Sequence, residues 1–243
     1  MSAQHTVLLL GGTGRTGRRV LEQLLSRGVN IRVIVRSAHG LPPVAARDPG
    51  LTVVDADLLS LGDDEILRQV HDCDAVISCL GHAVGLKGIL GPPHDLVTQA
   101  ATKACRAIEA LQPAEPVKLI LMSSVSVNRR GGLDRRRGRF EKALLWMLRG
   151  IMPPARDNQR AADFLYDSFA MTSPFVRWVA VRPDTLREDN VSEYTLHEGL
   201  VMSAAGKPKP LVAERIPLLE AARAHQLLER GGHAGKVVLV ASA

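Results

Sequence analysis

Residues 6–17 read TVLLLGGTGRTG, and this stretch decides the fold. It begins with a continuous apolar run, which is typical of a strand buried on both faces of a parallel sheet. Glycines follow at Gly11, Gly14 and Gly17, and the residues from there to Arg27 place apolar side chains at helical spacing. A buried strand, a glycine-rich turn and an amphipathic helix form the context in which G-x-x-G-x-x-G binds the pyrophosphate of a dinucleotide.

Each glycine of this turn has its own physical role. The first lets the chain leave the strand sharply, the second lets the backbone approach a pyrophosphate, and the third lets the helix lie close to the sheet. The helix then points its N-terminal N–H groups and positive dipole end at the phosphates. We therefore predict cofactor contacts at Gly11, Thr13, Gly14, Arg15, Thr16 and Gly17. The alternative is a plain strand–helix turn that happens to be rich in glycine.

The rest of the chain alternates short β-branched runs with longer helical stretches. We expect strands at residues 6–10, 31–35, 51–54, 75–80, 117–122, 178–181 and 236–240, and helices at 14–27, 63–71, 95–111, 157–169 and 218–230. This alternation predicts an α/β fold, a Rossmann-like doubly wound parallel sheet, with ligands bound at the carboxyl ends of the strands. The 243 residues suit a single domain, in which residues 128–156 form a small insertion over the site.

Two strand ends bear on the choice of dinucleotide. An acidic residue after the second strand would bind the ribose 2′-hydroxyl of NAD and repel the 2′-phosphate of NADP. This sequence has Arg36 and Ser37 there, and Arg15 in the turn is expected on the same side. Since arginine pairs well with phosphate, we expect NADP(H), with NAD(H) as the less favoured cofactor. Asp57 and Leu58, after the third strand, either meet the adenine ring or form an ordinary loop with a capping aspartate.

Six segments follow one another along the chain: residues 11–17, Val35-Arg36-Ser37, Asp57-Leu58, Ser78-Cys79-Leu80-Gly81, Met122-Ser123-Ser124 and Val181-Arg182-Pro183-Asp184-Thr185-Leu186. With these segments in this order, the sequence resembles an atypical short-chain dehydrogenase/reductase of the NAD(P)H-binding group. That group includes the NmrA-like proteins and biliverdin/flavin reductase. The resemblance implies that Cys79, Leu80 and Gly81 line the ribose and nicotinamide. It also implies that Ser124 faces the substrate and that Pro183 lies beside the carboxamide.

The sequence departs from this family at the proton donor. Better-known members use a Tyr-x-x-x-Lys pair, whereas neither Tyr166 nor Tyr194 has a lysine four residues later. We take Ser124 and His82 as candidate catalytic residues, and Ser123 as a cofactor contact. A histidine at a strand end can act as an acid near neutral pH. Both residues could equally be capping or loop residues, and the same holds for His94.

The charge and composition of the chain limit the kinds of partner that it is expected to bind. The net charge of +6 is concentrated in six arginines between residues 129 and 139, but aromatic residues make up only 3%, which argues against single-stranded nucleic acid. The apolar stretch at residues 140–152 is expected to form a helix that ends at Pro153 and Pro154 and covers the site or packs on a protein partner. Three cysteines without metal-type spacing indicate reduced thiols and no metal site. No signal peptide or membrane span is evident, so we expect a cytoplasmic protein.

Two functional hypotheses follow. The first is an NADPH-dependent reductase that passes hydride to a planar conjugated acceptor such as a flavin, quinone or enone, which needs little help from a protein acid. The second is a non-catalytic NADP(H) sensor or scaffold of the NmrA-like type, in which the cofactor reorders residues 128–152 and changes a protein contact. Only the arginine cluster supports binding to nucleic acid, so we do not expect a nucleic-acid partner.

Overall fold

The structure is a computed structural model that describes residues 5–43, 45–82, 91–124, 127, 146–147, 152–169, 173–183, 212–217 and 236–240. Contacts within the chain group it into two units. The first consists of Met1–Val127 with Ala143–Pro183, and the second of Asn128–Lys142 with Asp184–Ala243. The expectation of one domain with an insertion at residues 128–156 stays a prediction.

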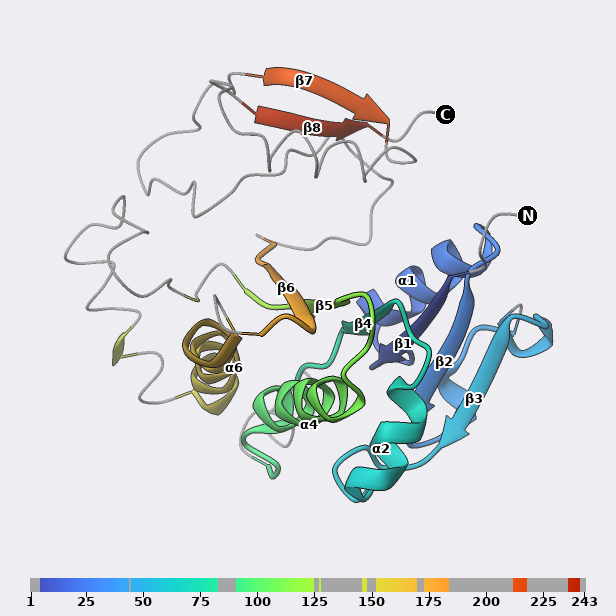
Figure 1. Cartoon of the computed structure of the whole chain (residues 1–243), viewed down its shortest axis with the longest axis horizontal. Helices are drawn as coiled ribbons and strands as arrows, with labels where there is room; N and C mark the ends of the chain where they lie inside the picture. The colour runs from blue at the N-terminus through green and yellow to red at the C-terminus, as the bar shows by residue number, and fades with distance from the viewer. Residues whose placement is uncertain are drawn as a thin grey trace. The chain divides into compact units, whose positions relative to one another are not determined.

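The first unit contains a six-stranded, fully parallel sheet (Figure 1). Its strands are β1 (Thr6–Leu10), β2 (Asn30–Val35), β3 (Leu51–Asp55), β4 (Ala75–Ser78), β5 (Val117–Met122) and β6 (Val176–Val181), in the spatial order β3-β2-β1-β4-β5-β6. The predicted Rossmann-like doubly wound fold is confirmed. Because the order reverses beside β1, the carboxyl ends of β1, β2 and β4 border the place where such sheets bind ligands.

Helices cover both faces of the sheet. The helix α1 (Arg15–Leu25) packs on one face, and α2 (Asp63–Val70), α4 (Leu96–Leu111) and α6 (Pro153–Phe169) lie side by side on the other (Figure 1). Right-handed crossovers require this division, because the chain moves one way from β1 to β2 and the opposite way from β3 to β6. Two 3₁₀ turns, η1 (Ala38–Gly40) and η2 (Ala45–Arg47), connect β2 to β3.

The central strand β1 separates two apolar clusters. Leu8 and Leu10 point into the cluster under α2, α4 and α6, whereas Leu9 points into the cluster under α1. Successive side chains of a strand point to opposite faces, so an uninterrupted apolar run is what a strand between two helical layers requires. The apolar run at residues 6–10 therefore places β1 in the sheet between the two helical layers. The turn that follows β1 then lies at the carboxyl edge of the sheet.

The structure differs from two expectations at the C-terminal side. The helix expected at 157–169 is α6, and it begins four residues earlier, at Pro153. Proline has no N–H to donate and a fixed φ, and both properties suit the first turn of a helix. The strand at residues 236–240 is confirmed as β8 (Lys236–Val240), but it pairs with an unpredicted strand, β7 (Val212–Pro217), in the second unit.

The other predicted elements of this side lie largely or wholly outside the described residues. This holds for the helix at 218–230 and for most of the stretch at 140–152, of which Trp146 and Met147 are described as helical. Among the described residues, none of the helices combines the length and apolarity needed to cross a membrane.

Candidate cofactor and active site

The glycine-rich turn after β1 is built on contacts that only glycine permits. Gly11 has a φ of +80°, in the left-handed region, and the N–H of Gly14 donates to its carbonyl oxygen at 3.0 Å. A Cβ at Gly17 would lie 2.0 Å from that same oxygen, and a Cβ at Gly12 would lie 2.5 Å from Cγ2 of Val33. Gly11 and Gly17 were expected to turn the chain and seat the helix, whereas the close approach at Gly12 was not anticipated.

The turn also touches the two strand ends beside it. A Cβ at Gly11 would lie 2.9 Å from the carbonyl carbon and oxygen of Cys79, which follows β4. On the other side, a Cβ at Gly40 would lie 2.8 Å from Cγ2 of Thr13, so η1 packs against the turn. The turn, the end of β2 and the end of β4 therefore form one continuous edge.

The first turn of α1 is open to an anion. Gly14 occupies the N-cap position and has no side chain that could cap the helix, and the first turn contains no acidic residue. The N–H groups of a helix's first turn and the positive end of the helix dipole favour a phosphate at such a position. The geometry of Gly14, Arg15, Thr16 and Gly17 thus fits the predicted pyrophosphate contacts, although Thr13 uses its methyl group to pack on Gly40.

The adenosine side of the predicted site holds an exposed arginine. Arg36 directly follows β2 and is exposed, while the hydroxyl of Ser37 accepts a hydrogen bond from the N–H of His39 and caps η1. Asp57 is exposed and accepts a bond from the N–H of Leu59 at 3.0 Å. The side chain of Leu58 is buried in the core under α2 and α4. In this structure Asp57 and Leu58 therefore have capping and packing roles, and their contact with adenine stays a prediction.

Two serine hydroxyls at the carboxyl edge have no partner among the residues that the structure describes. The Oγ atoms of Ser78, at the end of β4, and Ser123, just after β5, are buried and form no hydrogen bond within this part of the chain. A buried polar atom that stays unpaired costs free energy, so such atoms call for a water or ligand. Ser123 had been predicted as a cofactor contact from its position alone. Ser124, the neighbouring candidate, is half-buried and already has an interaction.

His82, the second catalytic candidate, is paired with a buried aspartate. Its Nε2 lies 3.0 Å from Oδ2 of Asp157, and the two side chains are 5% and 0% exposed. Asp157 belongs to α6, yet it caps α4: its Oδ2 accepts from the N–H of Val97 at 2.8 Å, and its Oδ1 from the N–H of Thr98 at 3.0 Å. The hydroxyl of Thr98 donates to Oδ1 at 2.6 Å.

Sequence reasoning missed Asp157 as a functional residue. From the sequence it was considered only as the first residue of the helix expected at 157–169. The pairing of Asp157 with His82 joins residues 75 positions apart, and no local spacing could reveal it. His94, by contrast, is exposed.

Two other candidates for chemistry are excluded by their surroundings. Burial raises the pKa of the Cys79 thiol to about 11, so this cysteine is not a thiolate nucleophile at neutral pH. Tyr166 lies in the C-terminal half of α6, away from the turn of that helix that holds Asp157. Among the described residues, no group of three or more His, Cys, Asp and Glu side chains could hold a metal ion.

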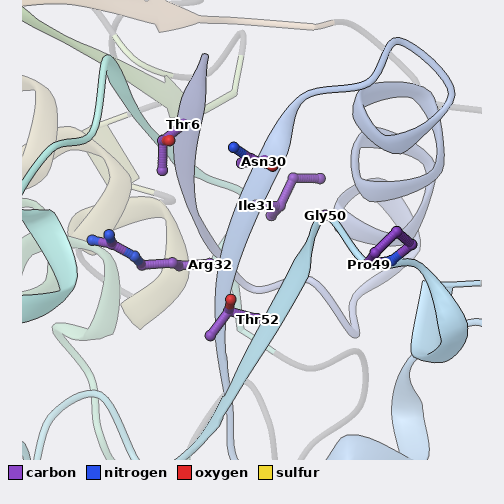
Figure 2. Close-up of a pocket in the computed structure, with 7 residues that line it drawn as sticks. All are labelled: Thr6, Asn30, Ile31, Arg32, Pro49, Gly50 and Thr52. Carbon is purple, nitrogen blue, oxygen red and sulfur yellow. The ribbon is translucent and has the colours of Figure 1, made fainter. Parts of the chain in front are cut away.

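A shallow pocket of about 190 Å³ lies at the opposite end of the sheet (Figure 2). It is lined by Thr6, Asn30, Ile31, Arg32, Pro49, Gly50 and Thr52. Nη1 of Arg32 donates to the carbonyl oxygens of Gln69 at 2.9 Å and His71 at 2.6 Å, and so caps the C-terminal end of α2. The pocket adjoins the amino ends of the strands and its cation is already paired, so the carboxyl edge remains the candidate site.

Comparison with curated proteins finds a relative that matches part of the chain. The chain is 30% identical over 125 residues to an uncharacterized chloroplastic protein of Arabidopsis thaliana, and this covers 50% of the chain and 42% of the relative. The chain thus matches less than half of that relative's length.

Similar solved structures share the fold. They include the oxidoreductase ylbE from Lactococcus lactis, with a TM-score of 0.53, 21% identity and coverage of 77% of this chain and 72% of that one. A protein from Lactobacillus casei has a TM-score of 0.56 at 17% identity, with 96% and 97% covered. Yeast methylglyoxal/isovaleraldehyde reductase complexed with NADPH has a TM-score of 0.53 at 13% identity, with 74% and 57% covered.

The sequence also matches the NAD(P)H-binding family over residues 11–214, a range that begins at the first glycine of the turn and includes the five strands β2 to β6 of the parallel sheet. Its turn, its open helix N-terminus and its unpaired serine hydroxyls are features that a dinucleotide would use. The chain therefore belongs to the NAD(P)H-binding family, and it has a Rossmann-like fold.

Proposed function

We propose that the protein is an NADPH-dependent reductase that passes hydride to a planar conjugated acceptor, of the flavin, quinone or enone type. The observation that carries this proposal is the pair of unpaired, buried hydroxyls of Ser78 and Ser123, beside an open glycine-rich turn. When bound, the nicotinamide supplies the hydride. The chain's own residues bind the phosphates at residues 11–17, direct hydroxyls toward the cofactor, and place Ser124 and His82 at the same edge.

The preference for NADPH rests on charge. Arg36 is exposed at the end of β2, and no acidic side chain directly follows that strand to repel a 2′-phosphate. A guanidinium can pair bidentately with a phosphate, whereas NAD(H) offers only hydroxyl groups at this position.

The acceptor class follows from the missing Tyr/Lys pair. Quinones, flavins and enones spread the incoming electron pair over a conjugated system, so they tolerate a weaker proton donor than a simple ketone does. The test is the oxidation of NADPH by the purified protein, followed by absorbance, with FMN, a water-soluble benzoquinone and cyclohexenone, and with NADH in parallel. Saturable turnover that prefers NADPH is the expected result.

A second candidate is a non-catalytic NADP(H) sensor. Trp146 and Met147 favour it, because their side chains are 78% and 49% exposed and could contact a protein partner. Tight NADPH binding without turnover on any acceptor would support the sensor and contradict the reductase. Protection of residues 128–152 from a protease on addition of NADPH would be the matching signature.

A further inference from the structure

We propose that His82 delivers the proton in this reduction and that Asp157 is the residue that positions it, in place of the missing Tyr/Lys pair. The inference rests on the proposed reductase function. It is carried by the buried contact between Nε2 of His82 and Oδ2 of Asp157 at 3.0 Å, and by the way in which the rest of the Asp157 side chain is bound.

The bonding of Asp157 fixes the protonation of the ring. The carboxylate already accepts hydrogen bonds from the N–H groups of Val97 and Thr98 and from the hydroxyl of Thr98. In each of these contacts an oxygen of the carboxylate is the acceptor. The facing Nε2 of His82 must therefore carry a hydrogen, so the neutral ring has its lone pair on Nδ1. Among the described residues, no hydrogen bond to Nδ1 is found, and this atom is available to exchange a proton.

Asp157 also sets where the ring lies. α4 has Asp95 at its N-cap, but the side chain of Asp95 makes no cap bond to the helix. Asp157 supplies this cap from α6 instead, to the second and third N–H groups, where an N-cap side chain normally binds. The same carboxylate thus locks α4 to α6 and holds the loop after β4 through His82. Because Cys79 in that loop packs against Gly11, the ring is tied to the edge that holds the turn.

The reduction then balances as follows. A bound nicotinamide would supply the hydride and be oxidised as the acceptor is reduced, and the oxygen or nitrogen of the acceptor would gain the new electron pair. That atom takes the proton from Nδ1–H of the doubly protonated His82, and the neutral Nε2–H ring remains. Asp157 stays ionised throughout and stabilises the charge of the protonated ring. His82 regains its proton from water before the next turnover.

The test compares His82→Gln and Asp157→Asn with the unchanged protein, using the fastest of FMN, the benzoquinone and cyclohexenone. We expect kcat to fall by about 100-fold in His82→Gln, a typical contribution of general acid catalysis, with NADPH affinity unchanged. Asparagine presents an N–H where the carboxylate accepted, so Asp157→Asn should also lower kcat and should move the ring hydrogen from Nε2 to Nδ1. Nitrogen-15 NMR of the His82 ring reads this tautomer directly.

Ala104→Gly is the matched control, since Ala104 is buried in α4 six residues after Thr98, beyond the N–H groups that Asp157 caps. This change weakens α4 but should leave kcat and the tautomer of His82 as they are. The control therefore distinguishes a positioning role of Asp157 from a general destabilisation of α4. If the protein turns over and His82→Gln keeps its kcat, the proton-donor role is overturned while the reductase stands. If the unchanged protein oxidises NADPH with none of the three acceptors, the proposed function is itself overturned, and the donor role with it.

Discussion

The Cα of Gly17 faces the carbonyl oxygen of Gly11 so closely that a Cβ at position 17 would lie 2.0 Å from that oxygen. Real Cβ atoms do not approach backbone oxygens to this distance, and neither group is at the end of a flexible side chain. The first turn of α1 and the end of β1 are therefore held together by the absence of a side chain, at the position where the cofactor's phosphates are expected.

Gly17→Ala should consequently damage both stability and binding. Overpacking against backbone is expected to cost about 3 kcal/mol of unfolding free energy, because the helix has to move away from the turn. NADPH affinity should fall by at least about tenfold. Gly28→Ala is the control: Gly28 has a φ of +69° but nothing within 4 Å, so strain alone should lower its stability and leave affinity unchanged. Urea unfolding and fluorescence titration measure the two quantities, and equal affinities for the two variants would contradict the assignment.

Arg36→Gln should reduce the preference for NADPH. Losing a charge-assisted pair with the 2′-phosphate is expected to weaken NADPH binding by about tenfold to a hundredfold, while NADH binding stays the same. Arg106→Gln removes an equal charge from the exposed surface of α4 and should change neither. The dissociation constants of both cofactors for both variants decide the matter. A parallel loss for NADPH in the two variants would indicate a general effect of net charge.

Ser123→Ala should have opposite effects on the free protein and on the complex. The hydroxyl of Ser123 is buried without a partner, so its removal should raise the unfolding free energy of the free protein by about 1 kcal/mol. The same change should weaken NADPH binding, because the hydroxyl is expected to bond to the cofactor.

Ser173→Ala provides the contrast for that experiment. The Ser173 hydroxyl accepts from the N–H groups of Phe175 and Val176 at 3.1 Å and donates to Glu109. Its loss should destabilise the free protein by about 1 to 2 kcal/mol and leave NADPH affinity as it is. Thermal unfolding with and without NADPH tests both variants, and destabilisation of the free protein by Ser123→Ala would mean that its hydroxyl is satisfied.

Stability should fall at alkaline pH because of the buried thiols. Burial raises the pKa of Cys105 from 9.0 to about 12, and that of Cys73 to about 11. Between pH 9 and 12 the folded protein keeps thiol protons that the unfolded chain releases. The free energy of unfolding that these protons contribute is therefore complete below pH 9 and is lost as the pH rises toward 12. At pH 10 the loss from Cys105 is about 1 kcal/mol.

Urea unfolding at pH 8, 9 and 10 measures this loss. Cys105→Ala is less stable at every pH because it leaves a small cavity, but its unfolding free energy should decline less steeply than that of the unchanged protein. Parallel declines would show that Cys105 contributes nothing to the pH dependence.

The local parts of this protein were determined by the sequence alone. The apolar run at residues 6–10, the glycines at 11, 14 and 17 and the alternation of strands with helices predict the sheet and the turn, because each depends on residues within a few positions of one another. Strand ends such as those before Arg36 and Ser123 could be located for the same reason. The start of α6 was placed four residues too late, at Asp157 instead of Pro153, because a proline can stand at the beginning of a helix as well as after its end.

Tertiary structure decided what the residues at the edge can do. Whether Ser123 has a partner, whether Leu58 is exposed and which carbonyl oxygens Arg32 contacts all depend on segments far away in the chain. The pairing of His82 with Asp157 is the clearest example, because it exists only where α6 packs against α4 and supplies the cap that α4 lacks. A buried carboxylate needs hydrogen-bond donors, and the fold can supply them from any part of the chain. The spacing of residues in the sequence therefore does not indicate which donors they are.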